Sequence, residues 1–351
     1  MIHSRHYNII VPSIDYNGPV TLLLDLGRRA VELDYEVTVY YLNSYIDSSI
    51  IDFNAEVKKL EMSDFKNMKG VVHSTCIKPD FVNFLIRTLN RNVFSVTTIP
   101  SFLYEDMKYD YNKWLAWITW RAWSLFSGIL DSRVVLSKTM QKYYATVAPS
   151  MTNDVIYHSR RADQAIVEVG ENVEKIRVQK KNYKYNLVFV AGLRPRKNLI
   201  KLIEEVYKFN DVSLTIFGDG PQRKLVEALV DVNTDQVMYL GHDSKAYTYL
   251  DLFDALVLPS FAEGLPTVVL EAIQRKCFCL LSDIAVHREL CSLGVGVICD
   301  HEKFSDFYQK IKEIKLMSKD AQAIEHLNRS KLKYFDHNNN FDMYQRVFSR
   351  R

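Results

Sequence analysis

The chain has few cysteines, and they are not spaced as a metal site or a disulfide framework would require. There are five in 351 residues, an odd number. Cys277 and Cys279 flank a single phenylalanine, which could be read as a metal or redox pair. Free cysteine packs as a small apolar residue, however, so we interpret this pair as part of a buried strand. Reduced thiols are typical of the cytoplasm, where we expect this protein to reside.

Several other features are missing. No apolar run is long enough to cross a bilayer, and the first residues lack the apolar core of a signal peptide. The net charge of +3 is close to balance, so nothing indicates general nucleic-acid binding. There is no internal repeat, and no Asp-x-Asp motif offers a pair of carboxylates to a divalent metal. We therefore expect no metal site, and a globular protein large enough for two domains.

Short apolar runs alternate with amphipathic segments of helix length along the whole chain. This alternation is typical of βαβ units and parallel sheets. Strands are expected at 8–11, 36–41, 71–73, 93–98, 133–136 and 155–157, and again at 187–190, 213–217, 237–240, 255–258, 278–282 and 297–299. Helices are expected at 20–33, 80–89, 112–126 and 138–145, and again at 199–209, 222–230 and 267–275.

The break between the two series defines the predicted domains. Residues 161–184 are charged and weakly patterned, and we interpret them as a linker. The prediction is an α/β protein with two doubly wound, Rossmann-like domains, residues 1–160 and 185–334. A C-terminal segment, 335–351, ends in an amphipathic stretch.

The segment from Leu258 to Ala272 carries the most informative pattern. An apolar strand ends at Pro259, Glu263 lies in the short loop that follows, and Glu271 lies eight residues further on. Pro266 stands where a helix should begin, and proline suits the first helical position because its missing N–H would have no partner there. Free amides at such a helix start can bind an anion such as diphosphate.

This pattern resembles the E-x7-E signature of the family-4 retaining glycosyltransferases. The resemblance implies the GT-B fold, in which two Rossmann-like domains face each other across a cleft, and in which the C-terminal segment crosses back to the N-terminal domain. It also implies that Glu263 contacts the donor sugar and that Glu271 accepts hydrogen bonds from the ribose. The residues expected to line the sugar and the phosphates are Gly264, Leu265, Pro266 and Thr267.

A second segment, Val190–Asn198, follows a strand and opens a helix. The family has a Gly-Arg-Leu-x-x-x-Lys stretch here that supplies an arginine and a lysine to the donor diphosphate. Lys197 matches the lysine, and its ammonium can neutralise the leaving diphosphate. Gly192 stands where the family has arginine. Arg194 or Arg196 would then reach the phosphates from a neighbouring position, unless both are solvated loop charges.

Gly218 and Gly220 end another predicted strand, in a Gly-x-Gly-Pro sequence that resembles the loop lining the family's nucleotide pocket. Glycine permits the close backbone approach that such a turn requires. The residue between them, Asp219, could equally be structural, and His242 in the following loop is interpreted as a surface residue.

The N-terminal half matches the family less well. Gly18, before the first helix, resembles the glycine loop that touches the donor diphosphate. Pro100 stands where many members have a histidine that contacts the donor sugar. The absence of this histidine puts the sugar contact, and the transfer activity, in question. His73, at the end of a predicted strand, could substitute in part or could be structural.

All four tryptophans fall in one predicted helix, at Trp114, Trp117, Trp120 and Trp123. A spacing of three spreads them over a broad arc of the helix. With Lys113 and Arg121 nearby, they could contact a membrane surface, where tryptophan is favoured. They could instead line an acceptor pocket or pack in the core.

The prediction is a metal-independent retaining glycosyltransferase of hexosyltransferase type, with Glu263, Lys197 and Arg196 as catalytic residues. The resemblance favours a UDP-sugar donor, no other cofactor, and a saccharide or lipid-linked acceptor in bacterial surface-polysaccharide synthesis. Within the cytoplasm, the protein could also be bound to the inner face of the cell membrane. Two alternatives stay open: a non-catalytic partner subunit of another glycosyltransferase, and a nucleotide-sugar epimerase.

Overall fold

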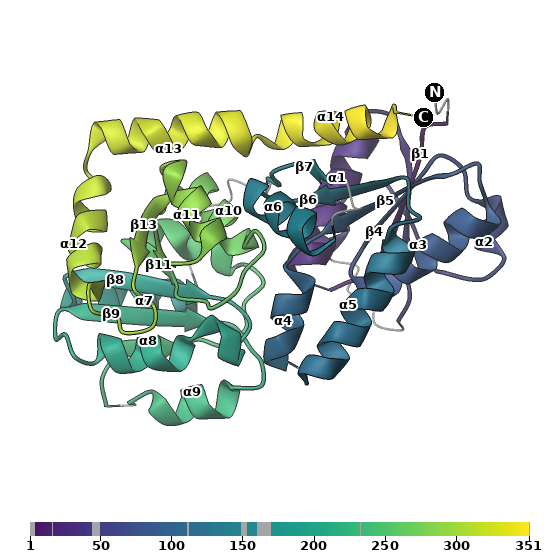
Figure 1. Cartoon of the computed structure of the whole chain (residues 1–351). Coiled ribbons are helices and arrows are strands. Elements are labelled where there is room, and N and C mark those ends of the chain that lie inside the picture. The colour runs from purple at the N-terminus through teal and green to yellow at the C-terminus, as the bar shows by residue number, and fades with distance from the viewer. Residues whose placement is uncertain are drawn as a thin grey trace. The chain divides into compact units, whose positions relative to one another are not determined.

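The computed structural model describes residues 4–15, 17–43, 50–110, 112–148, 153–159, 170–231 and 233–350. The chain divides into two compact units, each built on a parallel sheet with connecting helices (Figure 1). The first unit is Met1–Arg160 together with Phe335–Arg351, and the second is Arg161–Tyr334. The predicted α/β class is confirmed, since every strand pair in both sheets is parallel.

The sheet of the first unit has the strand order β3-β2-β1-β4-β5-β6-β7. Its strands are β1 (His6–Val11), β2 (Glu36–Tyr41), β3 (Glu56–Lys59), β4 (Val71–Thr75), β5 (Phe94–Ile99), β6 (Ser132–Val135) and β7 (Asp154–Val155). The apolar runs of the sequence identify six of these strands. The edge strand β3 was not predicted, because Glu-Val-Lys-Lys has only one apolar residue and the strand is largely exposed.

Seven helices lie among the described residues of the first unit. They are α1 (Gly18–Glu32), α2 (Asp64–Asn67), α3 (Ile77–Leu89), α4 (Leu103–Asp110), α5 (Lys113–Ser127), α6 (Lys138–Val147) and α14 (His337–Phe348). Helix α1 begins where the side chain of Asn17 accepts a hydrogen bond from the amide of Val20, at 3.1 Å. Pro19 in its first turn needs no hydrogen-bond partner. The helix therefore starts directly after the first strand and loop.

Helix α14 completes the core of the first unit. Phe341, Tyr344 and Phe348 are buried, and the ring of Phe341 meets that of Tyr7 on β1 at a centroid distance of 5.5 Å. The hydroxyl of Tyr344 lies 2.9 Å from that of Thr98 on β5. In Figure 1 this helix (yellow) runs beside α1 of the same unit. The last segment of the chain is thus an integral part of the first unit.

The sheet of the second unit has the order β10-β9-β8-β11-β12-β13. Its strands are β8 (Tyr185–Val190), β9 (Val212–Phe217), β10 (Val237–Tyr239), β11 (Ala255–Leu258), β12 (Cys279–Ser282) and β13 (Gly296–Cys299). Numbered within the unit, this is the order 3-2-1-4-5-6 of the doubly wound nucleotide-binding fold. The direction of winding reverses between β8 and β11, which are neighbours in the sheet.

The helical elements of the second unit are α7 (Glu171–Asn182), the 3-10 turn η2 (Pro195–Lys197), α8 (Leu199–Val206), α9 (Arg223–Leu229), the 3-10 segment η3 (Ala246–Leu252), α10 (Thr267–Gln274), α11 (Ala285–Ser292), α12 (Phe307–Met317) and α13 (Ala321–Tyr334). Helix α7 corrects one interpretation, because it lies inside the predicted linker. Val173 and Ile176 are buried, and Gln179 donates to the carbonyl of Asp235 at 2.6 Å. Because many residues of α7 are charged and exposed, its few buried residues do not form a recognisable helical pattern in the sequence.

Candidate functional site

The candidate site lies at the carboxyl ends of β8 and β11. Ligands of doubly wound sheets bind outside these ends, where the strand order reverses. Two loops leave the sheet there, residues 191–198 after β8 and residues 259–266 after β11. They are joined by their backbones, because the amide of Phe261 donates to the carbonyl of Arg196 at 2.8 Å. The two segments that the sequence singled out therefore meet at the position where the fold favours a ligand.

Three predicted site residues form one charged cluster on these loops. Lys197 donates through Nζ to Oε1 of Glu263, and the two form a buried ion pair. Arg196 Nη1 lies 3.4 Å from Oε2 of the same carboxylate and donates to the carbonyl of Ala262 at 2.8 Å. Two cations and one anion leave the cluster with a net charge of +1. An excess of positive charge around a fixed carboxylate suits an anionic ligand.

The charge state of Glu263 is set by this cluster. Its residue surface is only 5 % exposed, and burial by itself would raise its pKa. The charges of Lys197 and Arg196 outweigh burial and lower the pKa of Glu263 to about 2. The side chain is therefore a carboxylate at neutral pH. It can accept hydrogen bonds, but it holds no proton to give to a leaving group.

A second layer of polar residues supports Glu263 from inside the unit. Ser260 donates to Oε1 of Glu263 at 2.7 Å, and Ser282 donates to the carbonyl of Ser260 at 2.6 Å. His287 on α11 lies with Nδ1 2.8 Å from the hydroxyl of Ser282. Because Ser282 gives its proton to Ser260, Nδ1 of His287 must be the donor in that contact. Burial lowers the pKa of His287 to about 4, so its ring is neutral.

The residues that support Glu263 were not predicted from the sequence. Ser260 could have been, because it stands in the motif loop, three residues before Glu263. Nothing in the local sequence distinguishes Ser282 or His287, because their contacts depend on how β12 and α11 pack.

The loop before α10 differs in one respect from the prediction. The helix begins at Thr267, and Pro266 is its N-cap rather than its first helical residue. The amide of Val269 donates to the carbonyl of Pro266 at 3.0 Å, which closes the first turn. Gly264 and Leu265 are buried before it, and Glu271 is partly exposed on the second turn.

The predicted glycine loop packs against the loop that carries Lys197. A β-carbon on Gly220 would lie 2.8 Å from the carbonyl oxygen of Leu193, and one on Gly218 would lie closer still to Ala191. The backbones are linked as well, since Leu193 donates to the carbonyl of Asp219 at 2.9 Å. Gly192 and Arg194 are exposed at the tip of the same loop.

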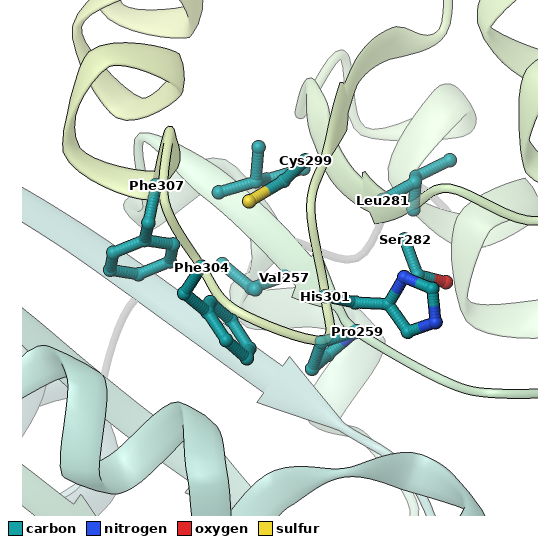
Figure 2. Close-up of a pocket in the computed structure, with 9 residues that line it drawn as sticks. Val257, Pro259, Leu281, Ser282, Cys299, His301, Phe304 and Phe307 are labelled. Carbon is teal, nitrogen blue, oxygen red and sulfur yellow. The ribbon is translucent and has the colours of Figure 1, made fainter.

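A small pocket adjoins the site under the ends of β11 and β12. Figure 2 shows the rings of Phe304 and Phe307 on one side and the imidazole of His301 on the other. Its lining is mainly apolar and includes neither Lys197 nor Glu263. The pocket is part of the core that supports the two loops.

The first unit holds the remaining predicted residues. Gly18 opens α1, and Pro100 follows β5 with part of its surface exposed. His73 is fully buried, with Nδ1 2.6 Å from the hydroxyl of Tyr7 and Nε2 2.7 Å from that of Thr98. Burial lowers the pKa of His73 to about 3. Both ring nitrogens are used within the core, so His73 is structural and cannot substitute for the missing histidine at Pro100.

The four tryptophans divide between two environments. Trp123 is buried, and its Nε1 donates to Asp80 at 2.8 Å, whereas Trp114 is 75 % exposed. Trp117 is also exposed, and Trp120 is partly buried. No single role fits the whole segment.

The described residues contain neither a cluster of metal ligands nor a helix that could span a membrane. Among these residues, no group of three or more His, Cys, Asp or Glu side chains lies close enough together to hold a metal ion. Among the same residues, no helix combines the length and hydropathy needed to span a bilayer.

The second unit of the chain matches a known protein family. Residues 171–330 match the model of the family described as Glycosyl transferases group 1. The O-antigen biosynthesis glycosyltransferase WclY of Escherichia coli is 23 % identical over 297 residues, which cover 80 % of this chain and 81 % of that protein. Residues 171–330 of this chain are thus similar to the glycosyltransferase group 1 family.

Solved structures show the fold of the whole chain. The Anabaena protein Alr3699/HepE, in complex with UDP and glucose, superposes with a TM-score of 0.77 at 13 % identity, covering 98 % of this chain and 99 % of that one. Sucrose-phosphate synthase from Thermosynechococcus elongatus gives 0.75 at 12 % identity, with 98 % and 99 % covered. The predicted GT-B fold class is confirmed.

Proposed function

We propose that this chain is a retaining glycosyltransferase that moves a sugar from a UDP-sugar to a saccharide or lipid-linked acceptor. The observation that carries the proposal is the buried Glu263 carboxylate held between Lys197 and Arg196 at the carboxyl ends of β8 and β11. HepE, which shares the fold, has been crystallised with UDP and glucose, and WclY is named for O-antigen biosynthesis. These names favour UDP and a role in surface-polysaccharide synthesis.

In this proposal the cationic side chains stabilise the leaving group. Charge builds up on the diphosphate as the sugar departs, and nearby cations and helix-start amides stabilise it. Lys197 and Arg196 provide two positive charges, of which Glu263 neutralises one. The amides before α10, those of Gly264, Leu265 and Thr267, would supply further donors. No metal ion is required for this arrangement, and we propose that the enzyme is metal-independent.

Glu263 is proposed to orient the donor sugar rather than to attack it. With a pKa of about 2 and an ion pair on each oxygen, it is a weak base and a poor nucleophile. It is well suited to accept hydrogen bonds from sugar hydroxyls. Retention would then follow from attack on the face that the diphosphate leaves, with the leaving phosphate taking the acceptor proton. Glu271 is proposed to bind the ribose.

The proposal is tested by donor hydrolysis. The protein is incubated with a panel of nucleotide sugars, and released UDP or another nucleoside diphosphate is measured. Release should fall about a hundredfold or more in Lys197→Ala and in Glu263→Gln. Lys201→Ala and Glu204→Ala are matched controls, because these exposed residues on α8 carry the same charges outside the cluster. Equal losses in the control variants would contradict the assigned roles.

Two alternatives are separated by the same assay. Gly192 and Pro100, which stand where the family has arginine and histidine, favour a non-catalytic partner subunit; that reading predicts no turnover with any donor or acceptor extract. A nucleotide-sugar epimerase predicts conversion of one nucleotide sugar into another without release. A thermal-shift panel of nucleotides would show which base is bound, and would separate loss of chemistry from loss of binding.

We further propose a location in the cytoplasm at the inner face of the cell membrane, where a lipid-linked acceptor would be available. The exposed face of α5 supports this part of the proposal.

A further inference from the structure

One face of α5 is apolar and uncovered within the first unit. Trp114, Trp117, Ile118 and Leu125 are all exposed, and Leu125 is 71 % exposed. At 3.6 residues per turn these positions fall within one stripe along the helix, with Arg121 in its middle. We call these five residues the α5 stripe.

The opposite face of α5 accounts for the packing of the helix. Ala116, Trp123 and Ser127 are buried, and Trp123 is fixed by its hydrogen bond to Asp80. Phe126 lies at the side, with its ring 5.4 Å from that of Phe81 on α3. The α5 stripe therefore does not contribute to the core of the first unit. Packing does not explain why the stripe is apolar.

The exposed apolar residues are also concentrated in this region. Eight of the fifteen large apolar side chains that are exposed in the described residues lie between positions 81 and 129. They are Phe81, Leu89, Trp114, Leu115, Trp117, Ile118, Leu125 and Ile129. Single exposed apolar residues are ordinary, but a group on one helix and its neighbour marks an interaction surface.

The charges on α5 indicate the kind of partner. The helix carries Lys113 and Arg121 and no aspartate or glutamate. Arg121 is exposed, with its guanidinium 5.7 Å from the ring of Trp120. Neighbouring α4 carries one lysine and three acidic residues, Glu105, Asp106 and Asp110, and Glu105 is paired with Lys108. The stripe thus presents apolar side chains around a cation, which complements a negatively charged surface with an apolar interior.

A second copy of this chain is a poorer match. In a two-fold dimer the same patch meets itself, so a contact through the stripe would bring Arg121 close to its own symmetry mate. No carboxylate on α5 is available to compensate. Tryptophan, moreover, is enriched at the headgroup level of bilayers, where its ring is apolar and its N–H stays hydrated.

We propose that the α5 stripe docks the first unit on an anionic lipid bilayer. Trp114, Trp117, Ile118 and Leu125 would enter the headgroup region with the helix lying along the surface, and Arg121 would pair with lipid phosphates. This inference deepens the proposed function by naming the surface that would bring the site to a lipid-linked acceptor.

The test measures sedimentation of the full chain with vesicles of phosphatidylcholine, with and without phosphatidylglycerol. The wild type should bind the anionic vesicles, with a blue shift of tryptophan emission as Trp114 and Trp117 leave water. Ile118→Glu with Leu125→Glu should reduce binding by about tenfold or more. Arg121→Gln should reduce binding to anionic vesicles by about fivefold, and Arg121→Lys should restore it.

The matched control is Leu225→Glu with Leu316→Glu, which places the same charges on exposed apolar positions of α9 and α12. It should bind as the wild type does. The proposal is overturned if the wild type stays in the supernatant, or if the control loses as much binding as the stripe variant. A dimer that dissociates in the stripe variant, without vesicle binding, would assign the stripe to a second copy. Vesicle binding needs no donor, so its failure and the failure of sugar transfer are separate results.

Discussion

Gly218 lies so close to Ala191 that a β-carbon on the glycine would be 1.9 Å from the carbonyl oxygen of Ala191. The two residues follow adjacent strands, β9 and β8, and the second begins the loop that carries Lys197. The contact therefore fixes the start of the loop that carries Lys197 against the sheet of the second unit. A glycine far from the charged cluster in sequence helps to position it.

Gly218→Ala should destabilise the protein by about 2 kcal/mol, because the methyl group must displace backbone rather than a flexible side chain. Urea unfolding would measure the change. Gly192→Ala is the matched control on the facing loop. An added β-carbon there meets only the carbonyl oxygen of Asp219, at 3.8 Å, so the stability should change by less than about 0.5 kcal/mol. Similar losses in both variants would refute the packing argument.

Gly192→Arg should be accepted by the fold and should tighten binding of UDP. The position is exposed and has room for a side chain, and the related family places an arginine here. A charge-assisted hydrogen bond to a phosphate should strengthen binding by about tenfold. Titration calorimetry would measure it, with Gly192→Gln as the uncharged control. Unchanged affinity in the arginine variant would indicate that the loop tip does not face the diphosphate.

The ion pair of Lys197 and Glu263 should show strong coupling in a double-mutant cycle. Glu263→Gln leaves a buried ammonium without its partner and should cost about 3 kcal/mol of unfolding free energy. Lys197→Met should also destabilise, because it leaves the carboxylate with one cation, Arg196, and the hydroxyl of Ser260. The double variant should lose much less than the sum of the two. Additive losses would mean that the two side chains do not interact in solution.

The same pair predicts how stability changes with pH. The pKa of Glu263 falls from its ordinary 4.5 to about 2 in the folded protein. The folded state therefore holds the carboxylate deprotonated where the unfolded chain would bind a proton. The resulting stabilisation, about 3 kcal/mol, is present above pH 4.5 and is lost as the pH falls towards 2.

Urea midpoints across this range would test it. The wild type should lose more stability than Glu263→Gln, which has no proton to bind at this position. Parallel curves for the two proteins would contradict the low pKa.

The sequence allowed most strands to be predicted, because buried parallel strands are continuous apolar runs. It failed for β3, whose exposed residues are mainly charged, and for α7, whose buried face is narrow. Helices α4, α11 and α13, where the apolar residues are few or irregular, were not predicted either. Helix α12 was also missed, although its buried residues Phe307, Ile311 and Ile314 stand at helical spacing. These elements are recognised only by what they pack against.

The candidate site divides in the same way. Lys197 and Glu263 were identified through the resemblance to the motifs of the family. Each also follows a predicted strand, and strand ends meet at one edge of a parallel sheet. Their direct pairing was not predicted, since it depends on the backbone bond between Arg196 and Phe261. The spacing of the tryptophans showed that they spread around a helix, but it did not show that Trp123 faces inward.

Helix α14 makes the first unit depend on a segment that is synthesised after the second unit. Residues 1–160 leave the ribosome before residues 161–334, and the aromatic side chains that cover Tyr7 and His73 follow only after both. Until α14 is made, the apolar surface that it covers on the first unit is exposed. A chain that is cut short before α14 would therefore be prone to aggregate through its N-terminal half.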